Sequence, residues 1–424
     1  MTSTTTPPGV LMIGTGEYTT GYVHGHASSS DKSKGVVALT LFDLRKQGKV
    51  GRMALCGTNG TKMPGIRTHL DSAIRQAYPA SEFDVSLDTY PADDATDAHA
   101  YIVALDSLTP GDMVTIYTPD DTHFDIALAA VERGIHVLLT KPLVKTLAEH
   151  RRLFDAARAR GVLVMCEVHK RWDPMYSDAR DRIREELGPL SYMVSFMSQP
   201  KKQLRTFAAW AGRSSDISYY LNSHHIDFLE WAVGDRSHAS QVTAMGAKGV
   251  AQRMLGVDTE DTITVNVQWA NDDGSVGTSS HTSSWIAPPS DVHSKQRFFF
   301  MGQSGQVQVN QAQRGYTADT DDAGHKSVNP LYMRYTPKAG KFVGQQGYGY
   351  QAIAAFVDAV LDIRAGRRSP EDFDSELPTV ANTFMTTAIL EAGRLSLDND
   401  GRPVKIVYAK DADGVERPTD LVVV

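Results

Sequence analysis

The stretch VLMIGTGEYTTG, residues 10–21, decides the fold. Its apolar run VLMI predicts a short buried strand, and Gly14 ends that strand in a turn. Gly14 permits a tight turn, and Gly16 lets backbone N–H groups approach a pyrophosphate. The third glycine of a G-x-G-x-x-G pattern would fall at Thr19, whereas the next glycine here is Gly21. Taken alone, the motif also fits a plain strand-to-helix turn.

Short apolar runs alternate with helical patterns through the first 170 residues. Further strands are predicted over residues 50–57, 112–119, 135–142 and 162–168, and helices over residues 35–48, 124–134 and 146–161. This alternation predicts βαβ units and a parallel sheet that is covered on both faces. Because the Gly-x-Gly turn follows the first strand, we predict a dinucleotide-binding Rossmann domain over residues 1–168.

The pattern changes in the second part of the chain. Residues 262–269, TITVNVQW, alternate between apolar and polar, which is typical of an antiparallel strand with one exposed face. Residues 271–274, NDDG, predict a hairpin turn, and residues 298–309 predict a second hairpin. The predicted fold class is therefore α/β: an N-terminal Rossmann parallel sheet followed by a C-terminal α+β domain with a mainly antiparallel open sheet. This second domain, over residues 169–424, would bind substrate and form the oligomer.

Composition limits the range of partners. The chain has 424 residues, of which 43 are basic and 50 acidic, for a net charge of −7. Nucleic acids and anionic membranes bind basic faces, so neither is an expected partner. The two cysteines, Cys56 and Cys166, allow at most one disulfide, which favours a reducing compartment. The N-terminus lacks the features of a secretory signal, and no apolar run approaches the ~18 residues that span a bilayer. We therefore expect a cytoplasmic protein.

The stretch LLTKPLVKT, residues 138–146, places a lysine directly before a proline at the end of a predicted strand. Lys141 is either a surface residue or a charge held in a cleft. Parallel sheets bind ligands at the carboxyl ends of their strands, which favours the cleft.

A neighbouring predicted strand ends in TPDDTH, residues 118–123. Thr118 and Pro119 are predicted to line a nicotinamide pocket. The carboxylates of Asp120 and Asp121 are predicted to do no more than cap the following helix.

The end of the second predicted strand bears on the choice between NAD and NADP. An acidic residue there would bind the ribose 2′-hydroxyl. Thr58 and Asn59 stand at this position instead, with Lys62 close behind. The pattern slightly favours NADP.

A second polar cluster lies in SYYLNSHHIDFLEWAVG, residues 218–234. His224, Asp227 and Trp231 fall on one face of a predicted helix, and His225 points elsewhere. A buried histidine is more often structural than catalytic, and two adjacent histidines leave both interpretations open. No third ligand at regular spacing is visible, so no metal site is predicted.

Together these motifs resemble the Gfo/Idh/MocA family of NAD(P)-dependent sugar and polyol dehydrogenases. The matching segments are VLMIGTG, TPDDTH, ALAAVERGIHVLLTKPL, HKRWDPMY, HHIDFLEWAVG and FFFMGQSGQVQV. The resemblance spans nearly the whole chain and implies the two domains predicted above. It also implies a homodimer or homotetramer, because the open sheet of such proteins often forms an interface. Family members carry Glu-Lys-Pro where this chain has Thr140, Lys141 and Pro142.

The resemblance also implies catalytic residues. Lys141 takes the position of the family's lysine, and His224 takes that of its histidine, three residues before Asp227. The family has an aspartate four residues before this histidine, and this chain has Tyr220. We expect Lys141 to donate a hydrogen bond to the reacting oxygen and His224 to accept or relay the proton. Tyr220, counted here with the catalytic residues, is expected to orient substrate hydroxyls together with Asn222. The remaining predicted site residues are Asn222, His225 and Arg171 for the substrate, and Gly14, Gly16, Glu17, Tyr18, Thr58, Asn59, Thr118, Pro119, His123, Lys141 and Pro142 for the cofactor.

The predicted function is hydride transfer between NAD or NADP and a secondary alcohol of a sugar, polyol or cyclitol. One alternative is a non-catalytic sensor that binds NAD(P) and a sugar, which the presence of Tyr220 favours. Another is an imine or tetrapyrrole-type reductase on the same scaffold. Arg171 either braces a ligand or forms a structural salt bridge. Loops around residues 198–216 and 287–296 are expected to shape the substrate pocket, with most of Lys201, Lys202, Arg205 and Arg213 facing water.

Overall fold

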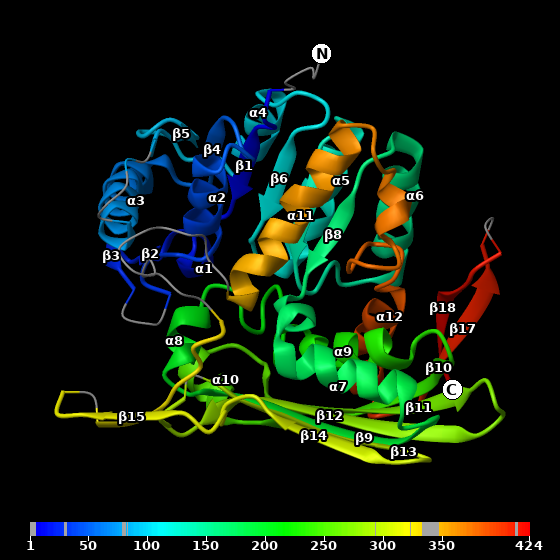
Figure 1. Cartoon of the computed structure of the whole chain (residues 1–424). Helices are drawn as coiled ribbons and strands as arrows, with labels where there is room; N and C mark the ends of the chain where they lie inside the picture. Colours follow the sequence, from blue (N-terminus) through cyan, green and yellow to red (C-terminus); the bar gives the residue numbers. More distant parts are fainter. Residues whose placement is uncertain are drawn as a thin grey trace.

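The computed structural model describes residues 6–28, 32–78, 82, 84–292, 294–322, 324–332, 347–411 and 414–424. Two sheets dominate it, and the helices that cover them lie between and around the sheets (Figure 1). None of the described helices combines the length and the apolar character needed to cross a membrane. Cys56 and Cys166 are both buried free thiols.

The first sheet has six parallel strands in the order β5-β4-β1-β6-β7-β8. These strands are β1 (Val10–Ile13), β4 (Met53–Cys56), β5 (Asp88–Tyr90), β6 (Met113–Ile116), β7 (His136–Thr140) and β8 (Val164–Glu167). Strand β1 lies between β4 and β6, so the chain order reverses there. In open parallel sheets this switch point is where ligands bind.

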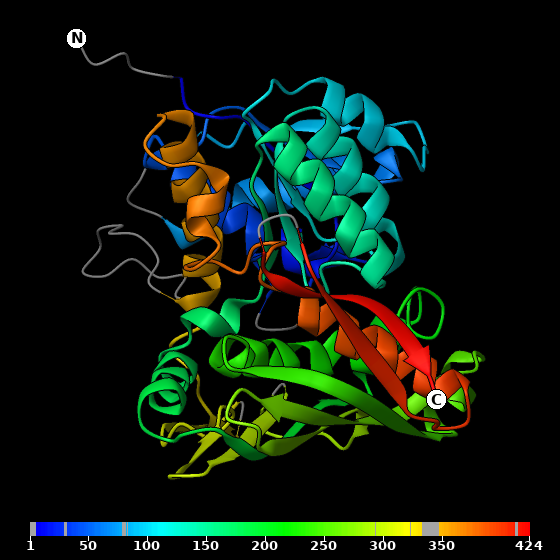
Figure 2. The same cartoon turned by 90° about the vertical axis from the view of Figure 1, so that its right-hand side faces the viewer.

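Helices cover both faces of this sheet, which explains why all four residues of β1 are buried. Leu11 and Ile13 pack with α4 (Ala100–Asp106), α5 (His123–Glu132) and α6 (Leu147–Arg160). Val10 and Met12 pack with α2 (Val37–Lys46), α3 (Met63–Ala77) and α11 (Tyr348–Arg364). The chain therefore returns to its first sheet at α11, a helix that lies far along the sequence (Figure 2).

The predicted ends of helix α6 are seen in the structure. The Thr146 hydroxyl accepts from the Glu149 N–H, and the Glu149 carboxylate accepts from the Thr146 N–H, each at 3.2 Å. Gly161 closes the helix with a φ of 60°. These two features are a capping box and a left-handed C-cap.

A short insertion near the N-terminus was not predicted. Helix α1 (Glu17–Thr20) has four residues and leads into a hairpin of β2 (Tyr22–Val23) and β3 (His26–Ala27) before α2 begins.

The second sheet has eight strands in the order β14-β13-β9-β12-β11-β10-β17-β18. They are β9 (Leu190–Pro200), β10 (Ser237–Lys248), β11 (Glu260–Asn271), β12 (Val276–Ala287), β13 (Lys295–Gly302), β14 (Gln306–Asn310), β17 (Val404–Lys410) and β18 (Glu416–Val423). The β9–β12 pair is parallel and the other neighbouring pairs are antiparallel. The prediction of a mainly antiparallel sheet is confirmed.

Helices cover one face of this second sheet. Helices α7 (Pro174–Glu185), α9 (Ser223–Val233) and α12 (Phe384–Asp398) lie on the side that faces the first sheet (Figure 1). The alternation in β11 matches this arrangement, because Val265 and Val267 are buried while Asn266 and Gln268 are exposed. The remaining described elements are α8 (Gln203–Phe207), α10 (Val250–Leu255), β15 (Thr317–Thr320) and β16 (Gly324–Ser327).

Candidate active site

The turn after β1 has the geometry that a dinucleotide needs. Gly14 has a φ of +110°, and a Cβ atom at this position would lie 2.1 Å from the Tyr117 carbonyl oxygen. A side chain is therefore excluded at this position. A Cβ atom on Gly16 would meet nothing within 4 Å, so there is open space beside the loop. This space, at the switch point of the sheet, fits a pyrophosphate.

Glu17 and Tyr18 continue this loop. The Glu17 carboxylate accepts a hydrogen bond from the Ser28 hydroxyl. The Tyr18 ring stacks on Tyr117 with 5.3 Å between centroids, and the Tyr18 hydroxyl accepts from Tyr332 at 2.8 Å. Tyr18 thus connects the loop after the glycine turn to Tyr117, at the end of β6, and to Tyr332, far along the chain.

Two of the residues predicted to read the ribose lie at the end of β4. Thr58 is exposed, and so is Lys62. The Asn59 side chain accepts from the Thr61 N–H at 3.0 Å and so caps the 3₁₀ turn that begins at Gly60. Asn59 therefore shapes the turn, and Thr58 and Lys62 face the solvent.

Lys141 lies at the carboxyl end of β7, where a cis peptide joins it to Pro142. Its ammonium group donates to the Tyr220 carbonyl oxygen and lies 4.2 Å from the centroid of the Tyr220 ring. Burial lowers the pKa of Lys141 to about 8, against the opposing effect of the Asp120 and Glu167 carboxylates. Lys141 is therefore half-buried, with its ammonium group engaged by the second part of the chain.

Asp120 is not a helix cap, contrary to the sequence-based prediction. Neither the 3₁₀ turn η2 (Asp120–Thr122) nor α5 has a side-chain cap. Its carboxylate instead accepts from the Ser215 hydroxyl of the second domain. Burial raises the pKa of Asp120, and the nearby charges of Lys141 and Lys145 oppose that effect. Asp120 therefore lies near the ammonium groups of Lys141 and Lys145.

Glu167 supplies a second carboxylate near Lys141. It is the residue paired with Thr140 across the β7–β8 ladder, so it lies beside the position where the family motif has its glutamate. Its side chain is bound by Nδ1 of His169 at 3.2 Å.

His224 lies in the first turn of α9, and its ring is near Lys141 and His169. Its ring centroid is 5.4 Å from that of His169. Burial lowers the pKa of His224 well below its ordinary value, and the nearby charges of Lys141 and Lys170 lower it further. Its Nδ1 is buried and has no hydrogen-bond partner among the described residues. His224 is thus a neutral imidazole with a vacant nitrogen beside a lysine.

Other predicted substrate residues are engaged in the interior. The Asn222 amide donates to the Ser218 hydroxyl at 3.0 Å within the π-helical turn η4 (Ser218–Asn222). Nε2 of His225 lies 3.0 Å from the Tyr176 hydroxyl, and the His225 ring is 1% exposed. Both side chains are buried and engaged by these neighbours, so their role toward a substrate stays a prediction.

Arg171 forms the structural salt bridge that was one of its two predicted roles. Its guanidinium binds both Asp227 oxygens, at 3.1 and 2.7 Å, and both side chains are buried. The bridge joins the 3₁₀ turn η3 (His169–Trp172) to helix α9.

The His123 ring links the residues that follow strands β6 and β7. Its two ring nitrogens lie 3.0 Å from the Thr118 carbonyl oxygen and 2.9 Å from the Pro142 carbonyl oxygen. The His123 ring is fully buried, and its two contacts hold the ends of β6 and β7 together. Pro119, by contrast, is exposed.

Several residues of the cluster were missed by sequence analysis. Lys170 and His169 follow β8 directly, and the polar run EVHKR after an apolar strand is a signal that would have found them. Tyr332 and Tyr348 pack on the other side of His169, with centroid distances of 5.4 and 5.7 Å. These two tyrosines have no comparable signal in the sequence.

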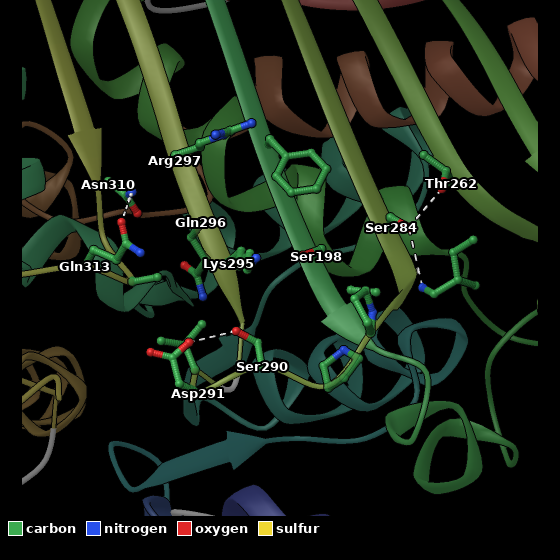
Figure 3. Close-up of a pocket in the computed structure, with 17 residues that line it drawn as sticks. Ser198, Thr262, Ser284, Ser290, Asp291, Lys295, Gln296, Arg297, Asn310 and Gln313 are labelled. Atoms are coloured by element: carbon green, nitrogen blue, oxygen red, sulfur yellow. Dashed lines mark hydrogen bonds between the residues drawn. The ribbon is translucent and has the colours of Figure 1, made fainter. Parts of the chain in front are cut away.

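A separate cavity of about 520 Å³ lies at the end of the second sheet (Figure 3). It is lined by Ser198, Pro200 and residues of the segment 284–297, so part of each predicted pocket loop contributes to it. Lys201, Lys202, Arg205 and Arg213 are all exposed, as expected. Lys141 and His224 do not line this cavity, and Gln296 of its wall accepts a hydrogen bond from Lys170.

Comparison with known proteins places this geometry in context. Residues 9–168 match the model of an oxidoreductase family with an NAD-binding Rossmann fold, GFO_IDH_MocA. A scyllo-inositol 2-dehydrogenase (NAD(+)) of Bacillus subtilis is 27% identical over 141 residues, which cover 33% of this chain and 39% of that protein. A D-xylose 1-dehydrogenase (NADP(+)) of Haloferax volcanii is 29% identical over 213 residues, which cover 48% of this chain and 64% of that protein.

The fold of the whole chain matches solved structures. A myo-inositol 2-dehydrogenase from Lactobacillus plantarum superposes with a TM-score of 0.63 at 18% identity, covering 95% of this chain and 100% of that one. This likeness shows the fold, a parallel Rossmann-like sheet followed by a second, mixed sheet. The sequence matches to the curated relatives above cover less than two thirds of their length.

Proposed function

We propose that this chain, whose residues 9–168 match the Gfo/Idh/MocA oxidoreductase family model, is an NAD(P)-dependent dehydrogenase. Its substrate would be a secondary alcohol of a sugar, polyol or cyclitol. The observation that supports this proposal is that Lys141, at the end of β7, lies near enough to His224 of helix α9 for its charge to lower the pKa of that histidine.

The two side chains have complementary protonation states. The Lys141 pKa of about 8 leaves most of its ammonium groups charged at neutral pH, so it can donate a hydrogen bond to an alcohol oxygen. The low pKa of His224 leaves its imidazole neutral, and its vacant Nδ1 can accept a proton. Alcohol oxidation needs both, because the hydroxyl proton leaves as negative charge develops on oxygen.

The cofactor residues follow from the same geometry. A bound nicotinamide dinucleotide supplies the hydride acceptor. The backbone of Gly14 and Gly16 would hold its pyrophosphate, and Thr118, Pro119 and Pro142 would bound the space for its nicotinamide. Thr58 and Lys62 at the end of β4 favour a 2′-phosphate, which supports NADP over NAD.

One observation favours a second function. Tyr220 occupies the position of the family's aspartate, and its carbonyl oxygen and ring engage the Lys141 ammonium. A protein with this lysine permanently engaged would bind cofactor and sugar without turnover and act as a sensor.

The proposal is tested by following nicotinamide absorbance with a panel of sugars, polyols and cyclitols. Lys141→Ala should lower turnover at least ~100-fold while cofactor binding, measured by fluorescence, is retained. Lys145→Ala is the matched control, because Lys145 lies on the same loop and its ammonium binds the Ser214 carbonyl at 2.9 Å. Unchanged turnover in Lys141→Ala would exclude the proposed mechanism, and cofactor binding without turnover in the wild type would select the sensor.

A further inference from the structure

The cations around the candidate site differ in how their charge is compensated. Arg171 is paired with Asp227, and Arg314 is paired with Asp173. Lys141 has the Asp120 and Glu167 carboxylates nearby. Lys170 has only the Asp173 carboxylate nearby, which it shares with Arg314, and it is one of the largest fully buried side chains in the described part of the protein.

The contacts of Lys170 are with neutral groups. Its ammonium donates to the Tyr176 hydroxyl at 3.3 Å and to the Gln296 side-chain oxygen. It lies 4.4 Å from the centroid of the Tyr176 ring. No carboxylate of the described residues forms an ion pair with it, because Asp173 is held by Arg314. Segment 333–346, which lies outside the described residues, contains no aspartate or glutamate in its sequence.

Two buried cations, Lys170 and Arg314, share one carboxylate, so their charge is only partly compensated. Incomplete compensation of buried charge destabilises a fold, and its presence in a candidate site points to a function. The electrostatic effect of Lys170 reaches the reactive group, because both Lys170 and Lys141 lower the pKa of His224. Burial lowers the pKa of Lys170 itself to about 7; the Asp173 carboxylate opposes this effect, and the charges of Arg314 and Lys141 add to it. A bound anion would reverse this effect and stabilise the ammonium.

We propose that the substrate carries a carboxylate that pairs with Lys170, so that the protein acts on an acidic sugar such as a uronic or aldonic acid. This inference rests on the dehydrogenase function proposed above. One ammonium and the free amide N–H₂ of Gln296 suit a planar, singly charged carboxylate. A phosphate carries more charge and more acceptor oxygens than these two donors satisfy.

The replacement of the family aspartate by Tyr220 is consistent with an acidic substrate. An aspartate at that position would add a negative charge beside Lys141 and repel an anion in the same site. Tyr220 instead presents its ring and carbonyl oxygen to the lysine. The departure from the family pattern therefore removes a like charge from the substrate's surroundings.

The test compares matched pairs of substrates that differ in one carboxylate. Glucose is compared with glucuronate, and galactose with galacturonate, each with the cofactor that the protein uses. We expect kcat/KM to be at least about tenfold higher for the acid of a pair. Lys170→Met should abolish this ratio and raise the melting temperature, because it removes an incompletely compensated buried charge while keeping the length of the side chain. Lys201→Met, which removes an exposed cation on a nearby loop, should keep the ratio.

A second variant guards against misfolding of the first. Gln296→Glu places a carboxylate against the Lys170 ammonium and should also abolish the preference for the acid. Neutral sugars turned over as well as their acids, or an acid preference that survives Lys170→Met, would overturn the inference and leave the dehydrogenase function intact. If nothing is turned over, calorimetric binding of glucuronate and galacturonate to the cofactor-loaded protein decides: Lys170-dependent binding supports the anion site, and absence of binding overturns it.

Discussion

At the scale of single residues, the candidate site combines Lys141 and His224 with charged and polar groups from both parts of the chain. The carboxylates near Lys141 come from Asp120 and Glu167, both at strand ends of the first sheet. Tyr220, from the second domain, contributes a carbonyl oxygen and a ring. The lysine is therefore tuned mainly by the cofactor domain, and its protonation should respond to changes there.

Asp120→Asn tests this arrangement. The Asp120 carboxylate raises the pKa of Lys141, so its removal should lower that pKa below about 8. The ammonium form is lost as pH rises through the pKa. The alkaline limb of the kcat/KM profile should therefore move toward neutral pH, with activity at pH 8 falling by about three- to tenfold. Asp121→Asn, at an exposed neighbouring position, is the control, and identical profiles for both variants would contradict the role of Asp120.

Cofactor preference is a second residue-scale prediction. Thr58→Asp places a carboxylate at the end of β4, where it would accept a hydrogen bond from a ribose 2′-hydroxyl and repel a 2′-phosphate. We expect the ratio of NADP to NAD affinity, measured by fluorescence titration, to fall at least ~10-fold. Thr61→Asp, at an exposed position in the following turn, should change it less. A wild-type protein that already prefers NAD would show that the polar end of β4 does not select the phosphate.

At the scale of elements, the sequence predicted well wherever one periodic signal determined the structure. The buried strands, the capping box of α6 and the alternation in β11 are local patterns, and the structure confirms them. The return of α11 to the first sheet was not predictable, because its apolar stripe fits either sheet equally well. The β2–β3 hairpin was missed because its strands have two residues each.

The candidate site shows the same contrast between local sequence signals and contacts made by distant parts of the chain. Lys141 and His224 were singled out from the sequence because each ends or begins an element within a recognisable motif, and their catalytic role stays a prediction. Asp120 was misassigned because a carboxylate before a helix usually caps it, whereas here a contact from the second domain engages it. His225 and Asn222 were assigned to the substrate because the helical face alone does not show which neighbours fill the interior.

The joint between η3 and α9 gives an element-scale prediction. The buried Arg171–Asp227 pair fixes the turn that carries Lys170 against the helix that carries His224. Asp227→Ala leaves a buried guanidinium without its partner and should lower the free energy of unfolding by about 3–5 kcal/mol. The double variant Arg171→Met/Asp227→Leu removes both charges and should cost much less. Urea denaturation measures both, and equal losses would show that packing dominates the contribution of this pair.

At the scale of the whole molecule, buried histidines should make the free energy of unfolding decrease at acidic pH. Burial lowers the pKa values of His136 and His150 to about 4 and that of His281 to about 3. In the unfolded chain each has an ordinary pKa near ~6.5. The unfolded state therefore takes up protons first as the pH falls.

The stabilising effect is fully present above pH ~6.5 and is lost as the pH falls toward the folded-state values. Because each pKa unit corresponds to ~1.4 kcal/mol, the three groups together should lower stability by several kcal/mol between pH 6.5 and 4. Melting temperatures across this range measure the slope. His281→Gln should make it shallower, and His26→Gln, at an exposed position, should not. A flat profile in the wild type would contradict the burial argument.

The face of the second sheet that carries no helices has an apolar patch that bears on assembly. Tyr192 and Val194 of β9 lie opposite Met301 and Phe299 of β13, and the four side chains form an apolar patch on that face. Tyr192, Val194 and Met301 are 40%, 36% and 38% exposed, which is unusual for neighbouring large apolar side chains. We propose that this patch is buried in a homodimer or homotetramer.

Charges on the patch should prevent that assembly without disturbing the core, because these side chains point away from the helices. Val194→Glu/Met301→Glu is expected to give a monomer in sedimentation velocity at concentrations where the wild type is oligomeric. Val103→Glu is the matched control, since Val103 is 60% exposed on α4 of the first domain. A wild type that sediments as a monomer at micromolar concentration would contradict the proposal. An oligomer that survives both charges would place the interface on another surface.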